Sequence, residues 1–421
     1  MKDLSLSHRP APGRIVILND SSVVRGGATS LAVMSARLLS RRGYHVTFIA
    51  GDAGDNGAMA ADGIELIPLN GELLLDAGAA RSARRGLHDP VMRRYLDRFI
   101  AITDTPDTVY HLHGWSRILS PSVFEALRPV APRTLIHAHD FFLTCPNGAF
   151  FDFRRNELCD RRPLSASCLA TNCDRRSFAH KSWRVLRQRA LNKSLDLNAG
   201  WAGVLLPHPG MQPLMLQSGF PAGLMRTHRN PAVPFSRTRI RAEDNAVFCF
   251  VGRLQPGKGV EPLCHAARTA GVPLRVIGDT AGQPWLPEAF PEVEFTGWVE
   301  PGEVGTHLQD ARALVMPSRF REPFGLVAAE ASGSGLPVIV SDASLMSRDV
   351  DSSGLGLTVP VADPAAFADA LRQMADMPAP RVREISTRGF ARQDALAATP
   401  QDWADGLLEF YRTAIAQEQA A

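Results

Sequence analysis

The stretch Arg321-Glu322-Pro323-Phe324-Gly325-Leu326-Val327-Ala328-Ala329-Glu330-Ala331 lies between two apolar runs, residues 313–316 and 337–340. A Pro-Phe-Gly turn followed by good helix formers predicts a strand, a loop and a helix, in that order. Glu322 then lies in the loop and Glu330 on the second turn of the helix. The first N–H groups of that helix, from Phe324, Gly325 and Leu326, would point outward, where aligned peptide dipoles favour a phosphate group.

The two carboxylates of this stretch have two interpretations. Most acids in loops and on helix surfaces are solvated charges. Glu330, however, lies between Val327-Ala328-Ala329 and Ala331-Ser332-Gly333, small residues typical of a buried helix, where an unpaired charge is costly. A ligand with hydroxyls for the two acids and phosphates for the helix start would explain the pattern, and a sugar nucleotide carries both groups.

The length of the chain, 421 residues, predicts two domains of roughly 200 residues each. We place the first domain at residues 1–230, the second at 231–400, and a closing segment at 401–421. The composition, 45% hydrophobic and 21% charged, is that of a soluble globular protein. A net charge of +3 indicates no general nucleic-acid-binding surface.

The expected location rests on three observations. The amino end, Met1 to Arg14, is polar and lacks the apolar core of a secretion signal. No apolar run approaches the length that spans a bilayer. Six cysteines without a secretion signal are typical of a reducing compartment. We therefore expect a cytoplasmic protein.

Short apolar runs alternate with helix-length segments along the chain. This alternation predicts two doubly wound α/β domains with parallel sheets. The apolar spacing of residues 401–418 predicts a closing helix, and periodicity does not indicate which domain that helix packs on. The predicted strands are 14–20, 45–50, 64–69, 108–113, 134–139 and 203–206 in the first domain, and 247–251, 274–278, 293–297, 313–316, 337–340 and 357–361 in the second.

Two further features follow strand ends. Gly26 and Gly27 come after the first strand, and a glycine pair there is either a plain turn or a place where a ligand approaches the backbone. Arg253 and Lys258 flank a Gly-rich turn after strand 247–251. Such cations are either surface charges or converge on a diphosphate, and the acidic stretch in the same domain favours the diphosphate.

Several motifs of the second half occur in the order and spacing of one known family. They are Val251-Gly252-Arg253-Leu254 with Lys258-Gly259, Phe295-Thr296-Gly297-Trp298, Pro317-Ser318, the stretch from Glu322 to Ala331, and Gly335-Leu336-Pro337-Val338-Ile339. With these motifs the second half of the chain resembles family 4 of the retaining glycosyltransferases, the group 1 glycosyltransferases, and the first half resembles it more loosely. The resemblance implies the GT-B fold, with two facing Rossmann-like domains and a final helix that returns to the first. It also implies that a nucleoside-diphosphate sugar binds the second domain and an acceptor the first.

The resemblance also assigns roles at the donor site. It gives the two cations to the diphosphate, Glu330 to the ribose and Glu322 to the donor sugar. Fixed cations and N–H dipoles would act where the leaving diphosphate gains charge, so no catalytic cofactor or metal is expected, and the sequence has no Asp-x-Asp motif. The predicted donor-site residues are Gly26, Gly27, Arg253, Lys258, Gly297, Glu322, Phe324, Gly325, Leu326 and Glu330.

His139 ends the predicted strand 134–139, where the family commonly places a histidine that faces the sugar. A histidine at a strand end is usually a satisfied polar residue, but the carboxyl edge of a parallel sheet faces the cleft. We therefore predict a catalytic role for His139 beside those of Glu322, Arg253 and Lys258. His113, on the same face as His111, ranks second. Retention would proceed by front-face attack assisted by the leaving phosphate.

An insertion at about residues 141–195 departs from the resemblance. It contains Cys145, Cys159, Cys168 and Cys173 among glycines and prolines. Four thiolates can hold zinc tetrahedrally and staple an irregular loop, although the spacing includes no Cys-x-x-Cys pair. The alternatives to a structural zinc site are a redox-sensitive cluster and scattered small buried residues.

The same insertion is rich in cations and aromatic residues. Such an excess is either a solvated face or a surface for an anionic partner, such as a polyprenyl-diphosphate-linked saccharide or the inner face of a membrane. Nucleic acid is disfavoured because no recognised binding module accompanies the cations. The cations are Arg154, Arg155, Arg161, Arg162, Arg175, Arg176, Lys181, Arg184, Arg187, Arg189 and Lys193, with Arg81, Arg84, Arg85, Arg93 and Arg94 as an extension.

The sequence therefore predicts a cytoplasmic, membrane-peripheral, retaining hexosyltransferase. Its donor would be a nucleoside-diphosphate sugar and its acceptor a saccharide or lipid-linked saccharide in surface polysaccharide or glycolipid assembly. Two alternatives stay open. One is a nucleotide-sugar epimerase or glycan phosphorylase of the same twin-domain shape, and the other is a non-enzymatic scaffold that binds through the Cys-rich basic loop.

Overall fold

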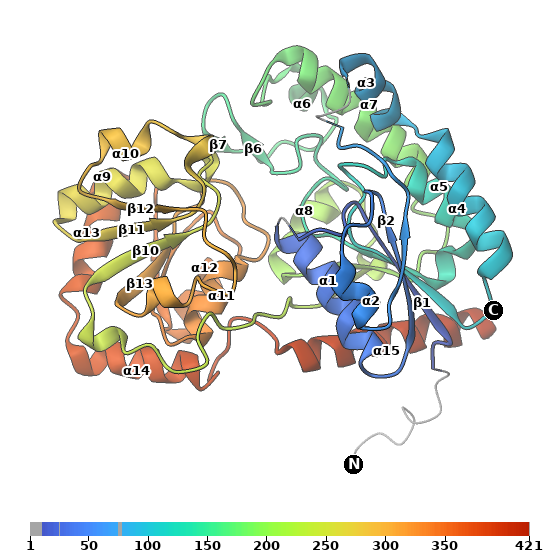
Figure 1. Cartoon of the computed structure of the whole chain (residues 1–421). Coiled ribbons are helices and arrows are strands. Elements are labelled where there is room, and N and C mark those ends of the chain that lie inside the picture. Colours follow the sequence, from blue (N-terminus) through green and yellow to red (C-terminus); the bar gives the residue numbers. More distant parts are fainter. Residues whose placement is uncertain (1–10, 25, 75–77, 421) are drawn as a thin grey trace. The chain divides into compact units, whose positions relative to one another are not determined.

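The computed structural model describes residues 11–24, 26–74 and 78–420. Residues 1–10, which make up most of the polar amino end, and Arg25, next to the Gly26-Gly27 pair, lie outside the described residues. The chain forms two compact units (Figure 1). Unit 1 comprises the described residues of Met1–Gly148, Arg161–Arg229 and Pro400–Ala421, and unit 2 comprises Ala149–Asp160 and Asn230–Thr399.

Unit 1 is built on a parallel sheet. Within its described residues the sheet has seven strands in the order β3-β2-β1-β4-β5-β8-β9. β1 pairs with β2 on one side and with β4 on the other, so the strand order reverses between β1 and β4. The strands are β1 (Arg14–Asn19), β2 (His45–Ala50), β3 (Glu65–Pro68), β4 (Thr108–Leu112), β5 (Thr134–His137), β8 (Gly203–Leu206) and β9 (Met225–Thr227).

Helices connect the strands of unit 1, and local sequence explains where they begin. At the start of α4, for example, the Asp89 carboxylate accepts the N–H groups of Val91 and Met92, and Pro90 occupies the first helical position. The helices are α1 (Gly27–Ser40), α2 (Gly57–Ala61), α3 (Ala79–Leu87), α4 (Pro90–Thr103), α5 (Ser122–Leu127), α6 (Ala166–Ala170), α7 (Phe178–Leu195) and α8 (Gln212–Gln217), with the 3-10 helices η2 (Arg128–Arg133), η3 (Pro209–Met211) and η4 (Ala222–Leu224).

The closing helix α15 (Pro400–Gln419) packs on unit 1, although unit 2 precedes it in sequence. It contacts β4 and η2, and it also packs against α1 (Figure 1). The hydroxyl of Tyr411 lies 2.7 Å from Nδ1 of His111, and both side chains are fully buried. Near the end of the helix, Glu418 forms an ion pair with Arg133. The predicted return of the final helix to the first domain is confirmed.

Unit 2 contains a second parallel sheet. Its described residues form six strands in the order β12-β11-β10-β13-β14-β15. Neighbouring residues of β10 point to opposite faces, because Phe248 and Phe250 pack with α9 and α13 while Cys249 packs with α11 and α12. Helices on both faces explain why β10 is apolar throughout. The strands are β10 (Val247–Val251), β11 (Leu274–Ile277), β12 (Glu294–Gly297), β13 (Ala311–Met316), β14 (Val338–Ser341) and β15 (Gly356–Val359).

Helices alternate with strands along unit 2 as they do along unit 1, so unit 2 also has the predicted α/β fold. The two doubly wound α/β units with parallel sheets are therefore confirmed. The helices are α9 (Val260–Ala270), α10 (Leu286–Ala289), α11 (Leu326–Gly333), α12 (Ser347–Ser353), α13 (Pro364–Ala375) and α14 (Ala379–Phe390), with the 3-10 helices η5 (Ala242–Asp244), η6 (Pro256–Lys258), η7 (Thr280–Gly282) and η8 (Thr306–Leu308).

A small hairpin belongs to unit 2 although it lies in the insertion that we expected within the first domain. It consists of β6 (Phe151–Asp152) and β7 (Glu157–Leu158), which pair antiparallel. Arg321 holds it there. The Arg321 guanidinium donates to the carbonyls of Phe150 at 3.4 Å and Cys159 at 2.9 Å and pairs with the Asp160 carboxylate at 2.5 Å.

Other differences from the predicted strands are small. β5 ends at His137, so His139 lies in the loop beyond the strand end. β9 escaped prediction because it has only three residues, of which Arg226 and Thr227 are exposed. Among the described helices, none is both long enough and apolar enough to cross a membrane.

Candidate functional site

Unit 2 brings together the loops at the carboxyl ends of β10 and β13. These strands are neighbours, and the strand order reverses between them, because β11 and β12 lie on one side and β14 and β15 on the other. A reversal of this kind opens a crevice outside the carboxyl ends of the two strands. The loop after β10 carries Arg253 and Lys258, and the loop after β13 carries Ser318 and Glu322.

An ion pair joins these two loops. Lys258 Nζ lies 2.7 and 3.0 Å from the carboxylate oxygens of Glu322, and the Ser318 hydroxyl donates to the same carboxylate at 2.9 Å. Burial by itself would raise the pKa of Glu322. The neighbouring Lys258 charge, the hydrogen bonds from Lys258 and Ser318, and the Arg253 charge outweigh burial and hold that pKa below its ordinary value. Glu322 is therefore a fixed carboxylate.

Two glycines let the loops approach closely. Gly259, after Lys258, has a φ of +74°, and a β-carbon there would fall 2.1 Å from the Pro317 carbonyl oxygen. Gly325, before α11, has a φ of +72°, and a β-carbon there would fall 2.9 Å from the Met316 sulfur. Only glycine adopts this conformation without strain, so these positions fix the path of both loops.

The start of α11 offers unused hydrogen-bond donors. The first N–H groups of a helix have no acceptor within that helix. In the described part of the chain, the N–H groups of Phe324 and Gly325 find no acceptor elsewhere. Gly325 is the N-cap residue and supplies no capping side chain. These donors, together with the helix dipole, favour an anion at this place.

Glu330 is half-buried on the second turn of α11. Its carboxyl group has neither an ion-pair partner nor a hydrogen-bond partner among the described residues. Burial raises the pKa of Glu330 to about 8. An acid that is buried without a partner costs stability, and donors from a bound ligand would remove that cost. Glu330 thus differs from Glu322, which has partners within the chain.

The remaining predicted residues of unit 2 lie at the same edge. Arg253 is exposed, and its charge acts on Glu322. Gly297 ends β12, where its carbonyl accepts the N–H of Gly278 at 3.0 Å. Phe324 is buried in the core, and Leu326 is half-buried. The structure thus gathers the predicted donor-site residues of unit 2 at one end of its sheet, while their individual roles stay predictions.

Four histidines form a ladder in unit 1. His111 and His113 come from β4 and its end, and His137 and His139 come from β5 and the loop after it. The rings of His137 and His139 stack with centroids 4.1 Å apart, and His113 Nδ1 lies 2.9 Å from His139 Nε2. Burial lowers the pKa of His139 to about 3. His139 is therefore neutral in any ordinary buffer.

The ladder has one geometric feature of a metal site. One nitrogen each from His111, His113 and His137 lies within 4.8 Å of the others. The ring of His137 is nearly parallel to those of His111 and His113, however, with interplanar angles of 13° and 27°. Stacked rings direct their lone pairs side by side rather than toward one point, so His111, His113 and His137 are packed core between the sheet and α15.

Gly26 and Gly27 begin α1 after β1 and are exposed. A β-carbon at Gly26 would meet nothing within 4 Å, so packing does not explain the glycine there. Asp20, just before this turn, has a role that was not predicted from the sequence. Its carboxylate accepts three backbone N–H groups of residues 117–119 at 2.8 to 2.9 Å and so shapes the loop after β4.

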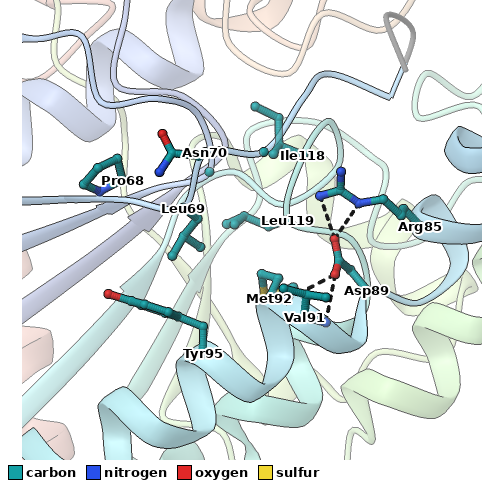
Figure 2. A pocket seen from close by; sticks show the side chains of 12 residues that line it. Pro68, Leu69, Asn70, Arg85, Asp89, Val91, Met92, Tyr95, Ile118 and Leu119 are labelled. Atoms are coloured by element: carbon teal, nitrogen blue, oxygen red, sulfur yellow. Dashed lines mark hydrogen bonds and ion pairs between the residues drawn. The ribbon is translucent and has the colours of Figure 1, made fainter. Parts of the chain in front are cut away.

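A pocket of about 250 Å³ lies beside the carboxyl ends of β2 and β3 in unit 1 (Figure 2). Leu69, Met92 and Leu119 contribute apolar walls. On one side Arg85 pairs with Asp89 at 2.8 Å, and Asp89 also caps α4. Since these two charges satisfy each other, the pocket suits a largely apolar group.

Several cations of the predicted basic surface have structural partners instead. Arg187 is buried and donates to the carbonyls of Gly86 and Ser116 at 2.9 and 2.7 Å. Arg184 pairs with Asp174 at 2.7 Å, and Lys181 is buried. Part of the basic excess in the insertion is thus internal and is not presented to a partner.

The four cysteines of the insertion fall in different units. Cys145, Cys168 and Cys173 belong to unit 1, whereas Cys159 belongs to unit 2. Cys145, Cys168 and Cys173 are buried, and Cys159 is partly exposed. Cys168 and Cys173 lie next to Lys181. The zinc site at the four cysteines stays a prediction.

Ser318 and Arg321 are residues of the unit 2 site whose roles were not predicted from the sequence. Ser318 had a usable signal, because a short hydroxyl directly after a strand and four residues before an acid can reach that acid. Arg321 had none, because its partners in the hairpin lie far away in sequence.

Comparison with known proteins identifies the family. Residues 245–377 match the family model of the group 1 glycosyl transferases. The D-inositol 3-phosphate glycosyltransferase of Corynebacterium glutamicum is 32% identical over 334 residues, which cover 73% of this chain and 72% of that protein. The chain belongs to the group 1 glycosyltransferases. The enzyme class predicted from the sequence, a glycosyltransferase that depends on a nucleoside-diphosphate sugar, is confirmed.

Two solved structures share the fold. Sucrose-phosphate synthase from Thermosynechococcus elongatus aligns with a TM-score of 0.70 at 20% identity, over 96% of this chain and 99% of that one. Anabaena Alr3699/HepE, solved in complex with UDP-glucose, aligns with a TM-score of 0.62 at 16% identity, over 97% and 99%. At these identities the likeness shows the fold alone, and the predicted GT-B fold is confirmed. Family membership favours the transferase over the epimerase, phosphorylase and scaffold alternatives.

The unpaired Glu330 predicts a pH-dependent stability difference. Because its pKa is raised from 4.5 to about 8 in the folded chain, the folded state holds a proton that the unfolded state has lost, and the native stability falls as the pH rises through this window. Glu330→Gln removes that titration. Between about pH 5 and about pH 8 we expect the free energy of unfolding of the ligand-free native chain to fall relative to that of the Glu330→Gln variant. Each tenfold difference in proton affinity between the folded and the unfolded state corresponds to about 1.4 kcal/mol. Urea unfolding at both pH values measures the difference.

The exposed Glu303 supplies the matched control Glu303→Gln. An equal pH dependence of both variants would contradict the buried, unpaired state of Glu330.

Arg321 connects the hairpin to the loop between β13 and α11, so its loss should loosen both segments. Arg321→Ala removes two carbonyl contacts and an ion pair with Ala149–Asp160, and a hydrogen bond from a charged group contributes about 1.5 to 3 kcal/mol. We expect faster amide hydrogen exchange in residues 149–160 and in the adjacent loop 318–326. Arg98→Ala, on the exposed face of α4, is the control. Unchanged exchange in both segments would show that the hairpin is held by other contacts.

Proposed function

We propose that the chain transfers a hexose from a nucleoside-diphosphate sugar, with retention of anomeric configuration, to a saccharide or lipid-linked saccharide acceptor in surface polysaccharide or glycolipid assembly. The observation that carries the proposal is Glu330, a half-buried acid without a partner among the described residues, one turn beyond unused N–H donors. A nucleotide sugar supplies what both groups lack, namely ribose hydroxyls for the acid and phosphates for the donors.

Each loop of unit 2 then has a chemical task. Arg253 and Lys258 supply positive charge where the departing diphosphate gains negative charge, together with the dipole of α11. Glu322, held by Lys258 and Ser318, orients the hydroxyls of the donor sugar. Lys258 is already paired before any ligand arrives, so its ammonium needs little reorganisation when the diphosphate binds. Preorganised charge of this kind is what an active site needs.

Retention is proposed from membership in the family. In that mechanism the acceptor attacks the face from which the diphosphate leaves, and the leaving phosphate assists. His139 enters the proposal as a neutral hydrogen-bonding group at the sugar, because burial holds its pKa at about 3 and excludes a role as a cationic acid. Anabaena Alr3699/HepE, which was solved with UDP-glucose, has the same fold. The nucleoside base that this chain binds is to be identified by the thermal-shift experiment described below.

The acceptor is proposed to bind unit 1, with its apolar part in the pocket beside β2 and β3. Helix α4, which lines that pocket, exposes Val91, Tyr95 and Ile102 by 67%, 44% and 70%. Spacings of four and seven residues place these side chains on one face, and the exposed Arg94 and Arg98 flank them. Apolar residues beside cations are typical of a helix that lies on an anionic membrane surface. We therefore propose that the acceptor is lipid-linked and lies at the inner face of the membrane.

The donor assignment is tested by nucleotide release. Without acceptor, the protein should slowly release nucleoside diphosphate from the right nucleotide sugar, and Glu330→Ala and Arg253→Ala should abolish the release. A thermal-shift panel of nucleoside diphosphates first identifies the base, because a ligand that binds only the folded state raises the melting temperature. Glu303→Ala serves as the control. Full release by both site variants would refute the assignment, and an inverted anomer in the product, read by NMR, would refute retention.

The membrane proposal is tested on vesicles. The double change Val91→Asp and Ile102→Asp should lower sedimentation with phosphatidylglycerol vesicles at least about tenfold, since inserting each large apolar side chain contributes about 1.5 to 3 kcal/mol. Leu216→Asp, at another exposed apolar position in unit 1, is the control. Equal binding by all three proteins, or equal binding to neutral phosphatidylcholine, would contradict the proposal.

A further inference from the structure

His139, in the loop after β5, uses one ring nitrogen within the chain and keeps the other open. Its Nε2 lies 2.9 Å from Nδ1 of His113, which directly follows β4. Its Nδ1 has no partner among the described residues, and the partly exposed side chain does not enclose it fully. A neutral imidazole carries a single N–H, so the proton on Nε2 decides whether Nδ1 donates or accepts.

The rings of His113 and His139 are aligned for a hydrogen bond. Their centroids lie 5.1 Å apart, with an interplanar angle of 22°, while the two nitrogens are only 2.9 Å apart. The nitrogens are closer than the centroids by about two ring radii, so the rings meet edge to edge and lie nearly in one plane. In this arrangement the N–H of one ring points at the lone pair of the other.

Ser35, on α1, decides which ring donates. Its Oγ lies 2.7 Å from the carbonyl oxygen of Ala32 and 3.4 Å from Nε2 of His113. Two oxygens at 2.7 Å share a proton, and a carbonyl has none to give, so the Ser35 hydroxyl donates to Ala32. Since that hydroxyl has one proton, Ser35 can only accept from His113. The N–H of His113 is therefore on Nε2.

The direction of the second hydrogen bond follows because both rings are neutral. No carboxylate among the described residues forms a hydrogen bond or an ion pair with either ring. Burial lowers the pKa of His113 well below its ordinary value and that of His139 to about 3. A neutral His113 with its N–H on Nε2 has a lone pair on Nδ1. His139 thus donates from Nε2 and keeps a lone pair on Nδ1.

We propose that Ser35 and His113 are positioning residues that hold His139 in the Nε2–H tautomer, so that its Nδ1 accepts a hydroxyl of the bound sugar. The sugar contact rests on the proposed function, whereas the tautomer does not. An acceptor at Nδ1 selects a group that donates, such as a sugar hydroxyl, over an ionised phosphate oxygen, which only accepts. The lone pair is in place before a ligand arrives, so binding requires no proton exchange within the ladder.

The first test reads both tautomers by NMR in the full-length chain labelled with nitrogen-15 histidine. A bare ring nitrogen and a protonated one differ widely in chemical shift, and correlations to the ring protons assign the two. Without ligand, at about pH 7, we expect both His113 and His139 to carry the proton on Nε2. The variants His113→Gln and His139→Gln assign the signals, because each removes one ring.

Ser35→Ala removes the acceptor for His113. Either tautomer of His113 then leaves one ring nitrogen unpaired, so we expect the Nδ1–H form to gain a measurable share in both His113 and His139. The matched control is Ser40→Ala, in the same helix, whose hydroxyl donates to the Asp62 carbonyl and contacts no histidine. The control should keep the native tautomers.

The second test compares calorimetric titrations with a nucleoside diphosphate and with its hexose-linked form, using the base that the thermal-shift panel selects. His139→Ala should weaken binding of the hexose-linked form about fivefold, the contribution of one neutral hydrogen bond. Ser35→Ala should weaken it about twofold, because about half of the molecules would hold the other tautomer. Both variants should bind the nucleoside diphosphate as the native chain does.

Three results would overturn the proposal. They are an Nδ1–H tautomer at either histidine of the native chain, unchanged tautomers in folded Ser35→Ala, and unchanged affinity of His139→Ala for the hexose-linked form. Thermal unfolding shows whether each variant is folded, and the tautomers of the native chain stay decisive if Ser35→Ala is not. Native chain that binds neither nucleotide would refute the proposed function and the sugar contact, while NMR decides the tautomers separately.

Discussion

The ion pair between Lys258 and Glu322 is the contact on which the arrangement of unit 2 depends. It joins the loops after two adjacent strands at the point where the strand order reverses. The side chains are 26% and 18% exposed, so loss of either partner would leave the other charge poorly hydrated and unpaired, which is far more costly than loss of a surface pair. Gly259 and Gly325 allow the loops after β10 and β13 to approach each other closely, and the ion pair favours one arrangement of these loops.

The two acids around the start of α11, Glu322 and Glu330, differ in the partners that the chain gives them. Glu322 already has an ammonium and a hydroxyl of the chain as partners. Glu330 has no partner among the described residues and carries a pKa raised by burial. Evolution seldom retains an unsatisfied buried acid for packing, whereas a perturbed titratable group in a crevice is typical of a functional site. The partners and the pKa shifts of Glu322 and Glu330 therefore distinguish the two acids better than their positions in the sequence do.

Much of this fold is visible in the sequence because buried parallel strands are continuous apolar runs. β8 and β10 have the predicted bounds, and the donor stretch is contiguous, so its strand, loop and helix follow from local chemistry. What escaped prediction is tertiary. Lys181 belongs to a run of cations that is typical of a solvated face, and only the folded chain reveals its sulfur neighbours. The histidine ladder likewise needs the register of β4 and β5 before its packing can be seen.

The hairpin of residues 149–160 has a consequence for how such a protein can be recombined. The chain passes between the two units at 148/149, 160/161, 229/230 and 399/400, so neither unit is one continuous stretch of gene. A chimera made by exchanging halves at residue 230 would take Arg321 from one parent and its carbonyl partners from the other. Unit 2 is inherited intact only as a discontinuous set, residues 149–160 together with 230–399. Part of the sequence that builds unit 2 therefore lies within the first half of the gene.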